Sequence, residues 1–196
     1  MNNKFFEWAG VITAILYSLF VALNIGIEFF GFCLLKYLQN IIRIYKEFME
    51  LTVYLSGEIH TNWRDEIINK CEVLKLPIEF LSPVTNHELS DDVGIEILGK
   101  EDKKFWHDHK SAKINSIRTK NAIEQADVVI VRFGDKYKQW NAAFDAGFCA
   151  ALGTPYITLH DEDIIHPLKE VDASAMAWAT TPEQVVELLT YVVSKS

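Results

Sequence analysis

Residues 127–153 constrain the fold of this 196-residue chain more than any other stretch. Residues 128–131 are all β-branched and apolar, which is typical of a strand buried on both faces of a parallel sheet. A polar loop follows, and a helix rich in alanine and phenylalanine begins near Trp140 or Asn141 and ends at Gly153. Because a strand buried on both faces needs helices on both sides, this stretch predicts an α/β fold.

Other strands and helices alternate along the chain in the same way. Besides the central strand, we expect strands at 51–55, 78–81 and 156–159, a short fifth strand at 175–179, and helices at 63–74, 105–125 and 182–193. Two polar segments, 84–104 and 160–172, are predicted to be loops, the first long enough to act as a lid. The alternation predicts a doubly wound, mostly parallel five-stranded sheet of the flavodoxin or Rossmann type.

A long hydrophobic helix is expected before this domain. Residues 8–27 carry no charge, and with Glu28 tolerated the apolar run reaches Lys36. Since a bilayer core of about 30 Å needs roughly 20 apolar residues, residues 1–36 are predicted to hold a transmembrane helix within 8–36. Residues 37–50 are predicted to be an amphipathic linker helix, and 51–196 the α/β domain.

The basic residues after the apolar run predict its orientation. Lys36, Arg43 and Lys46 follow it, so the domain is expected to be cytoplasmic and anchored to the inner face of a membrane. A buried core helix is one alternative. The other is a true start at Met49, which predicts a soluble cytoplasmic protein.

Charge and composition exclude several classes of partner. The net charge of -8 argues against a nucleic-acid polymer. The three cysteines are scattered without a CxxC motif, and His107 and His109 lie two apart on a predicted helix, so no metal site is expected. No glycine-rich nucleotide loop occurs, and no cofactor is expected.

The candidate site lies where the strands end, since ligands of open α/β sheets bind at that edge. Asp145 is expected near the start of the central helix, where the helix dipole stabilises a carboxylate, so it is the candidate nucleophile. Arg118 and Arg132 could each hold a phosphate or form a structural ion pair. The candidate substrate-binding residues are Ser56, Gly57, Glu58, Arg118, Arg132, Tyr137, Trp140 and Asn141.

Three segments resemble one known family. They are LTVYLSGEIHTNWRDEI, RTKNAIEQADVVIVRFGDKYKQWNAAFDAGFCAALGTP and the terminal TPEQVVELL. Together they resemble the YtoQ-type branch of the nucleoside 2-deoxyribosyltransferase superfamily, over residues from about 49 to the end.

The resemblance implies an activity as well as a fold. The better-known members of that superfamily exchange bases on deoxynucleosides through a glutamate that attacks C1′. The segment FDAG places Asp145 at the position of that glutamate, with one methylene fewer. Asn141 stands where those enzymes often have glycine, and Thr119, beside Arg118, stands where they tend to have aspartate.

Three functions remain open from the sequence. The first is glycosyl transfer at the N-glycosidic bond of a nucleoside or nucleotide, the second is hydrolysis of that bond, and the third is a catalytically silent, membrane-tethered nucleotide-binding module. The expected partners are a small nucleoside or nucleotide, a membrane through residues 8–36, and a second copy of the chain, because folds of this superfamily often assemble.

Overall fold

The computed structural model describes residues 11–16, 36–39, 41, 50–135 and 139–194, which fall into two units divided after Met49. In the first unit, the described residues 11–16 and 36–39 are helical. None of the helices among the described residues is long and apolar enough to cross a membrane. Most of the predicted span 8–36 and of the linker helix lies outside those residues, so the predicted transmembrane helix has no support.

The second unit is built on a five-stranded sheet in the order β2-β1-β3-β4-β5. Every neighbouring pair of strands is parallel, which confirms the predicted sheet. The order reverses between β1 and β3, and ligands bind at such a switch point. The strands are β1 (Leu51–Gly57), β2 (Ile78–Leu81), β3 (Val128–Phe133), β4 (Tyr156–His160) and β5 (Ala177–Ala179).

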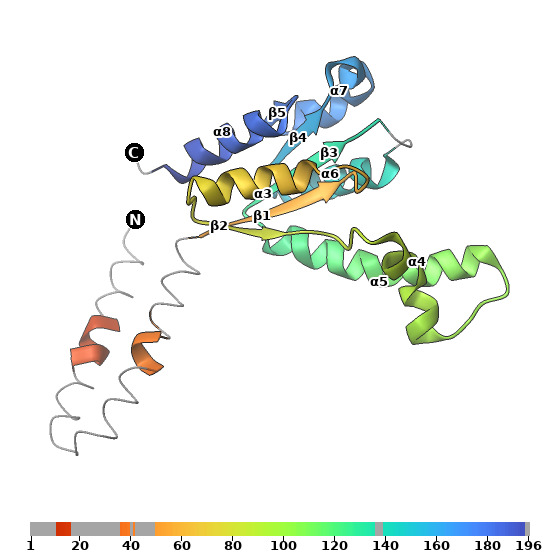
Figure 1. Ribbon diagram of the computed structural model, residues 1–196, viewed down its shortest axis with the longest axis horizontal. Helices are drawn as coiled ribbons and strands as arrows, with labels where there is room; N and C mark the ends of the chain where they lie inside the picture. The colour runs from red at the N-terminus through yellow and green to blue at the C-terminus, as the bar shows by residue number, and fades with distance from the viewer. Residues whose placement is uncertain (1–10, 17–35, 40, 42–49, 136–138, 195–196) are drawn as a thin grey trace. The chain divides into compact units, whose positions relative to one another are not determined.

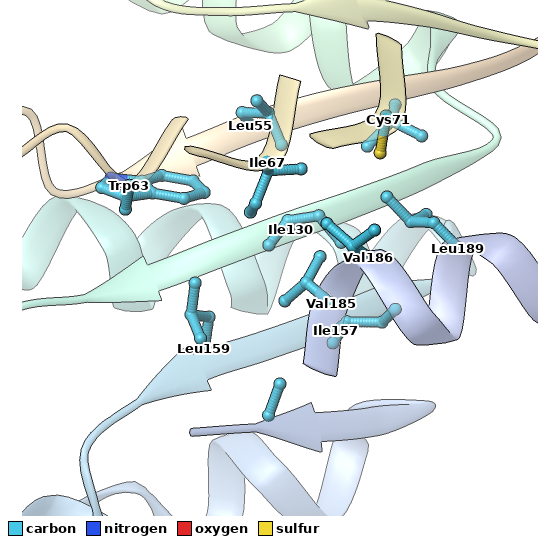
Figure 2. Packing of buried hydrophobic residues seen from close by; sticks show 12 residues of the cluster. Leu55, Trp63, Ile67, Cys71, Ile130, Ile157, Leu159, Val185, Val186 and Leu189 are labelled. Atoms are coloured by element: carbon cyan, nitrogen blue, oxygen red, sulfur yellow. The ribbon is translucent and has the colours of Figure 1, made fainter. Parts of the chain in front are cut away.

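Helices cover both faces of this sheet, as a doubly wound fold requires (Figure 1). The helices α3 (Trp63–Val73) and α8 (Pro182–Val193) pack on one face, where Val53 and Leu55 of β1 belong to their apolar cluster (Figure 2). The other face carries α5 (Lys104–Gln125), α6 (Trp140–Leu152) and α7 (Ile165–Ser174). Because side chains alternate along a strand, Tyr54 and Ser56 point toward this second layer.

The prediction of a loop at 84–104 was wrong. Its centre is the helix α4 (His87–Leu98), which begins at Asn86, whose side chain accepts a hydrogen bond from the Leu89 amide. Contact with α5 stabilises this helix. Where the two helices meet, the Gly94 amide donates a hydrogen bond to Ser111 Oγ at 2.9 Å. The two helices form a hairpin whose far end lies away from the sheet (Figure 1).

The predicted acidic loop at 160–172 is also mostly helical. After β4, the chain forms a short 3₁₀ turn, η1 (Glu162–Ile164), and then α7. One turn of apolar contact explains the helix, since Leu168 is buried in the cluster beneath it while Lys169 and Glu170 remain exposed. A high charge density hid this short amphipathic pattern.

We predict that Gly57→Ala destabilises the domain more than Gly153→Ala. Both glycines have positive φ, +95° and +74°, which strains any other residue. A Cβ at Gly57 would lie only 2.2 Å from the carbonyl oxygen of Arg132, whereas nothing lies within 4 Å at Gly153. Chemical denaturation should show a loss of about 3 kcal/mol or more for Gly57→Ala and about 1 kcal/mol for Gly153→Ala. Equal losses would contradict the close approach.

Candidate active site

The candidate site centres on a hydrogen bond between the first strand and the helix after β3. Ser56, near the end of β1, donates its hydroxyl to Oδ2 of Asp145 in α6 at 2.5 Å. Ser56 is fully buried and pairs in register with Val131 of β3, so this contact lies at the switch point of the sheet. The structure thus brings together two of the predicted site residues that are 89 apart in sequence.

Burial, rather than the helix dipole, controls the charge of Asp145. The residue is sixth in α6, beyond the first turn where the dipole acts, so the predicted stabilisation of the anion was wrong. Burial raises the pKa of Asp145 to about 6, while the bond from Ser56 opposes this shift. A carboxyl with that pKa is mostly ionised at neutral pH, yet poorly solvated, which suits a nucleophile or general base.

Tyr54 connects this carboxyl to a neighbouring pocket. It lies two residues before Ser56 on the same face, and burial raises the pKa of its phenol. Its hydroxyl shares a hydrogen bond with Thr119, and the charges of Asp145 and Arg118 both act on it. Sequence analysis missed Tyr54, although a phenol between Val53 and Leu55 in an apolar strand was a signal.

The pocket has a volume of about 260 Å³ and lies between the end of β2 and α5. It includes Arg118, one of the predicted binding residues. A larger apolar hollow of about 410 Å³ between α3 and α8 lies on the opposite face of the sheet from Asp145. The residues lining the smaller pocket are Tyr54, Leu81, Ser82, Pro83, Arg118, Thr119, Asn121, Ala122 and Gln125.

Arg64 fixes the loop between β1 and α3. Its buried guanidinium donates to the carbonyl oxygens of Leu55, Gly57 and Glu58, at 2.9, 3.0 and 2.5 Å. Burial lowers the pKa of Arg64 to about 10. Its guanidinium carbon lies 4.4 Å from the centroid of the Trp63 ring. This loop is therefore held in one conformation, by a residue that the sequence analysis did not single out.

Glu58 organises the same loop. Its carboxylate accepts hydrogen bonds from Thr61 Oγ1 at 2.6 Å and from the His60 amide, and the residue is 3% exposed. A Cβ at Gly134 would lie 2.4 Å from Glu58 Cγ, so the two segments are in close contact. Glu58 was predicted to bind the substrate, but its carboxylate is hydrogen-bonded within its own loop.

Arg132 does not join the group around Asp145. It alternates with Val131, which places it on the face of α3 and α8, and its guanidinium pairs with Asp161 at 3.3 Å. Its Nε is the one buried side-chain nitrogen or oxygen without a hydrogen-bond partner among the described residues. The sequence left open whether Arg132 holds a phosphate or forms a structural ion pair, and the structure contains the ion pair.

The remaining predicted residues lie at the start of α6. Trp140 and Asn141 are exposed there, Trp140 at 72%. Tyr137 lies outside the described residues. His107 contacts Asp92, whereas His109 stacks on Phe105, so these histidines face different neighbours.

The fold and the partly buried carboxylate at its switch point define a class, the doubly wound α/β proteins, which as a class bind ligands at the strand ends. The family model described as nucleoside 2-deoxyribosyltransferase YtoQ matches residues 54–193. This chain belongs to the YtoQ family, which confirms the family predicted from the sequence. An uncharacterised YtoQ protein of Bacillus subtilis (strain 168) is 46% identical over 144 residues, which are 74% of this chain and 97% of that protein.

Solved structures support the fold alone. A conserved protein from Enterococcus faecalis V583 superposes with a TM-score of 0.53 at 10% identity, over 73% of this chain and 99% of that one. A 2-deoxyribosyltransferase from Bacillus psychrosaccharolyticus gives a TM-score of 0.42 at 18% identity, over 69% of this chain and 90% of that one. The second similarity is too low to carry an argument.

We predict that Asp145→Asn stabilises the domain near neutral pH and not in acid. Because the folded pKa of about 6 exceeds the ordinary value near 4, folding binds the proton more tightly. The resulting stabilisation is complete below about pH 4 and is lost as the pH rises through about 6. Denaturation at several pH values should show a gain of up to about 3 kcal/mol at pH 7, and little at pH 4. The exposed acid Asp163, changed to Asn, is the control, and equal gains in both variants would contradict burial as the cause.

Arg64→Lys should destabilise the domain by roughly 3 kcal/mol, because the single ammonium nitrogen of lysine cannot reach all three loop carbonyls that Nε, Nη1 and Nη2 of Arg64 reach separately. The exposed Arg118, changed to Lys, should leave the free energy of unfolding nearly unchanged. Urea denaturation of the two variants measures the difference. Comparable stabilities would show that the loop does not depend on the guanidinium of Arg64.

Proposed function

We propose that this protein transfers a deoxyribosyl group between nucleobases, with Asp145 as the nucleophile. The carrying observation is the desolvated carboxylate at the switch point, oriented by Ser56. Membership of the YtoQ family supports the same reaction class.

In the proposed reaction, the Asp145 carboxylate attacks C1′ as the C1′–N bond to the departing base breaks. The acceptor base then attacks C1′ and releases the carboxylate. The bond from Ser56 engages Oδ2 and leaves Oδ1 as the reacting atom. Since aspartate is one methylene shorter than glutamate, the sugar must approach α6 closely, and the buried position beside β1 gives the shorter side chain a fixed direction.

The proposed substrate-binding residues lie on β1, α5 and the start of α6. Tyr54 is followed two residues later by Ser56, which bonds to Asp145, and with the pocket that it lines would supply a partly apolar wall for a flat base. Trp140, with Tyr137 before it, would stack on the base or sugar, and Asn141 would hold a sugar hydroxyl. A homo-oligomer also stays a prediction, with which the exposed Trp140 and Phe144 of α6 are compatible.

Incubation with a deoxynucleoside and a second free base tests the proposal. We expect base exchange by the native chain, and a loss of about a thousandfold or more in Asp145→Asn, because the nucleophile is removed. The rate should fall as the pH drops below about 6, where Asp145 becomes protonated. Asp127 is an exposed acid just before β3, at the opposite edge of the sheet, where it accepts a hydrogen bond from the Thr52 amide. The control variant Asp127→Asn should retain exchange.

The same assay separates the alternatives. Release of base without an acceptor would indicate hydrolysis of the same bond. Exchange that persists in Asp145→Asn, or its absence from the native chain, would exclude the proposed transfer.

A further inference from the structure

The pocket beside Tyr54 contains an uncompensated positive charge. Arg118 is the single charged residue among those that line it. In the described part of the chain, Arg118 forms no salt bridge, although the protein as a whole carries a net charge of -8. The residues three and four positions away on α5, which are its helical neighbours, are Ile114, Asn115, Asn121 and Ala122, none of them acidic.

The other candidate anion sites at this edge are filled by the chain itself. In the loop after β1, the Glu58 carboxylate takes the His60 amide and the Thr61 hydroxyl, which an incoming anion would otherwise use. Beyond β3, the charge of Arg132 is compensated by Asp161, which pairs with its two terminal nitrogens, although its buried Nε has no hydrogen-bond partner. Arg118 is the described cation at this edge that the chain leaves for a ligand.

The position of Arg118 links it to the reacting group. Tyr54 forms part of the pocket wall and lies two residues before Ser56 on the same face of β1, and Ser56 donates a hydrogen bond to Asp145. A ligand with C1′ at Asp145 can therefore extend past Tyr54 into the pocket. Ser82, Asn121 and Gln125 supply neutral donors beside the guanidinium, a combination that suits an oxyanion.

We propose that the substrate carries an anionic group bound by Arg118, either the phosphate of a nucleotide or a carboxylate on the base of a nucleoside. The assignment of a nucleoside core rests on the proposed function, whereas the anion preference rests on the pocket. A positive charge at this point also offsets the repulsion between an anionic substrate and the ionised Asp145.

Equilibrium binding tests the anion preference without turnover. The Asp145→Ala chain is titrated calorimetrically with a deoxynucleoside, its 5′-monophosphate, and a nucleoside with a carboxylated pyrimidine base. We expect one of the two anions to bind at least about tenfold more tightly than the neutral nucleoside, and this preference to weaken with added salt. The preferred anion identifies the source of the charge.

A matched pair of variants assigns the preference to one side chain. Arg118→Gln should reduce the ratio of affinities for anion and neutral nucleoside by about tenfold. Lys120→Gln removes the same charge from an exposed position on α5 that pairs with Glu124, and should leave the ratio unchanged. An Asp145→Ala chain without any anion preference, or a preference that survives when Arg118→Gln is added to it, would overturn the inference.

Binding and turnover fail separately. If the native chain shows no base exchange but the Arg118-dependent preference remains, the proposed transfer is wrong and the anion site stands. If base exchange occurs without such a preference, the anion site is wrong and the transfer stands.

Discussion

The contact between Ser56 and Asp145 depends on most of the structure around it. It requires β1 and β3 to be neighbours, Ser56 to point toward α6, and α6 to pack closely enough to withdraw the carboxyl from water. Desolvation of that carboxylate costs the folded state about 3 kcal/mol at neutral pH. The hydrogen bond from the Ser56 hydroxyl does not offset this cost. The packing of the buried strands and helices therefore compensates for it. A stabilising packing arrangement thus holds a poorly solvated carboxylate in place.

The charges near the strand ends follow a related principle. Arg64 binds backbone carbonyls, Glu58 binds donors of its own loop, and Arg132 pairs with Asp161. These charged groups are used for structure, which makes the edge of the sheet rigid and leaves few charges for recognition. Rigidity of this kind favours catalysis, since the reacting groups need not reorganise when the substrate binds.

The accuracy of the sequence analysis followed the strength of local patterns. The strand at 78–81 was predicted to the residue, and the last helix begins as expected with Pro182 after the capping Thr181. The helices α4 and α7 were missed because their charged residues favoured a loop, although apolar residues recur between them, and α4 also depends on tertiary packing such as the contact of Gly94 with Ser111. Asp145 and Ser56 were found as candidates, but neither their contact nor the roles of Tyr54 and Arg64 follow from spacing along the chain.

The sequence by itself determined the parallel α/β class, because runs of β-branched residues between amphipathic helices can be buried only in that way. It also determined the family, through motifs that extend over the whole domain. Only the tertiary structure decided which charges are available. Whether Asp145 is solvated and whether Arg132 is paired depend on neighbours that lie tens of residues away along the chain. The physical cause is burial, which changes the energy of a charge without any sign in the local sequence.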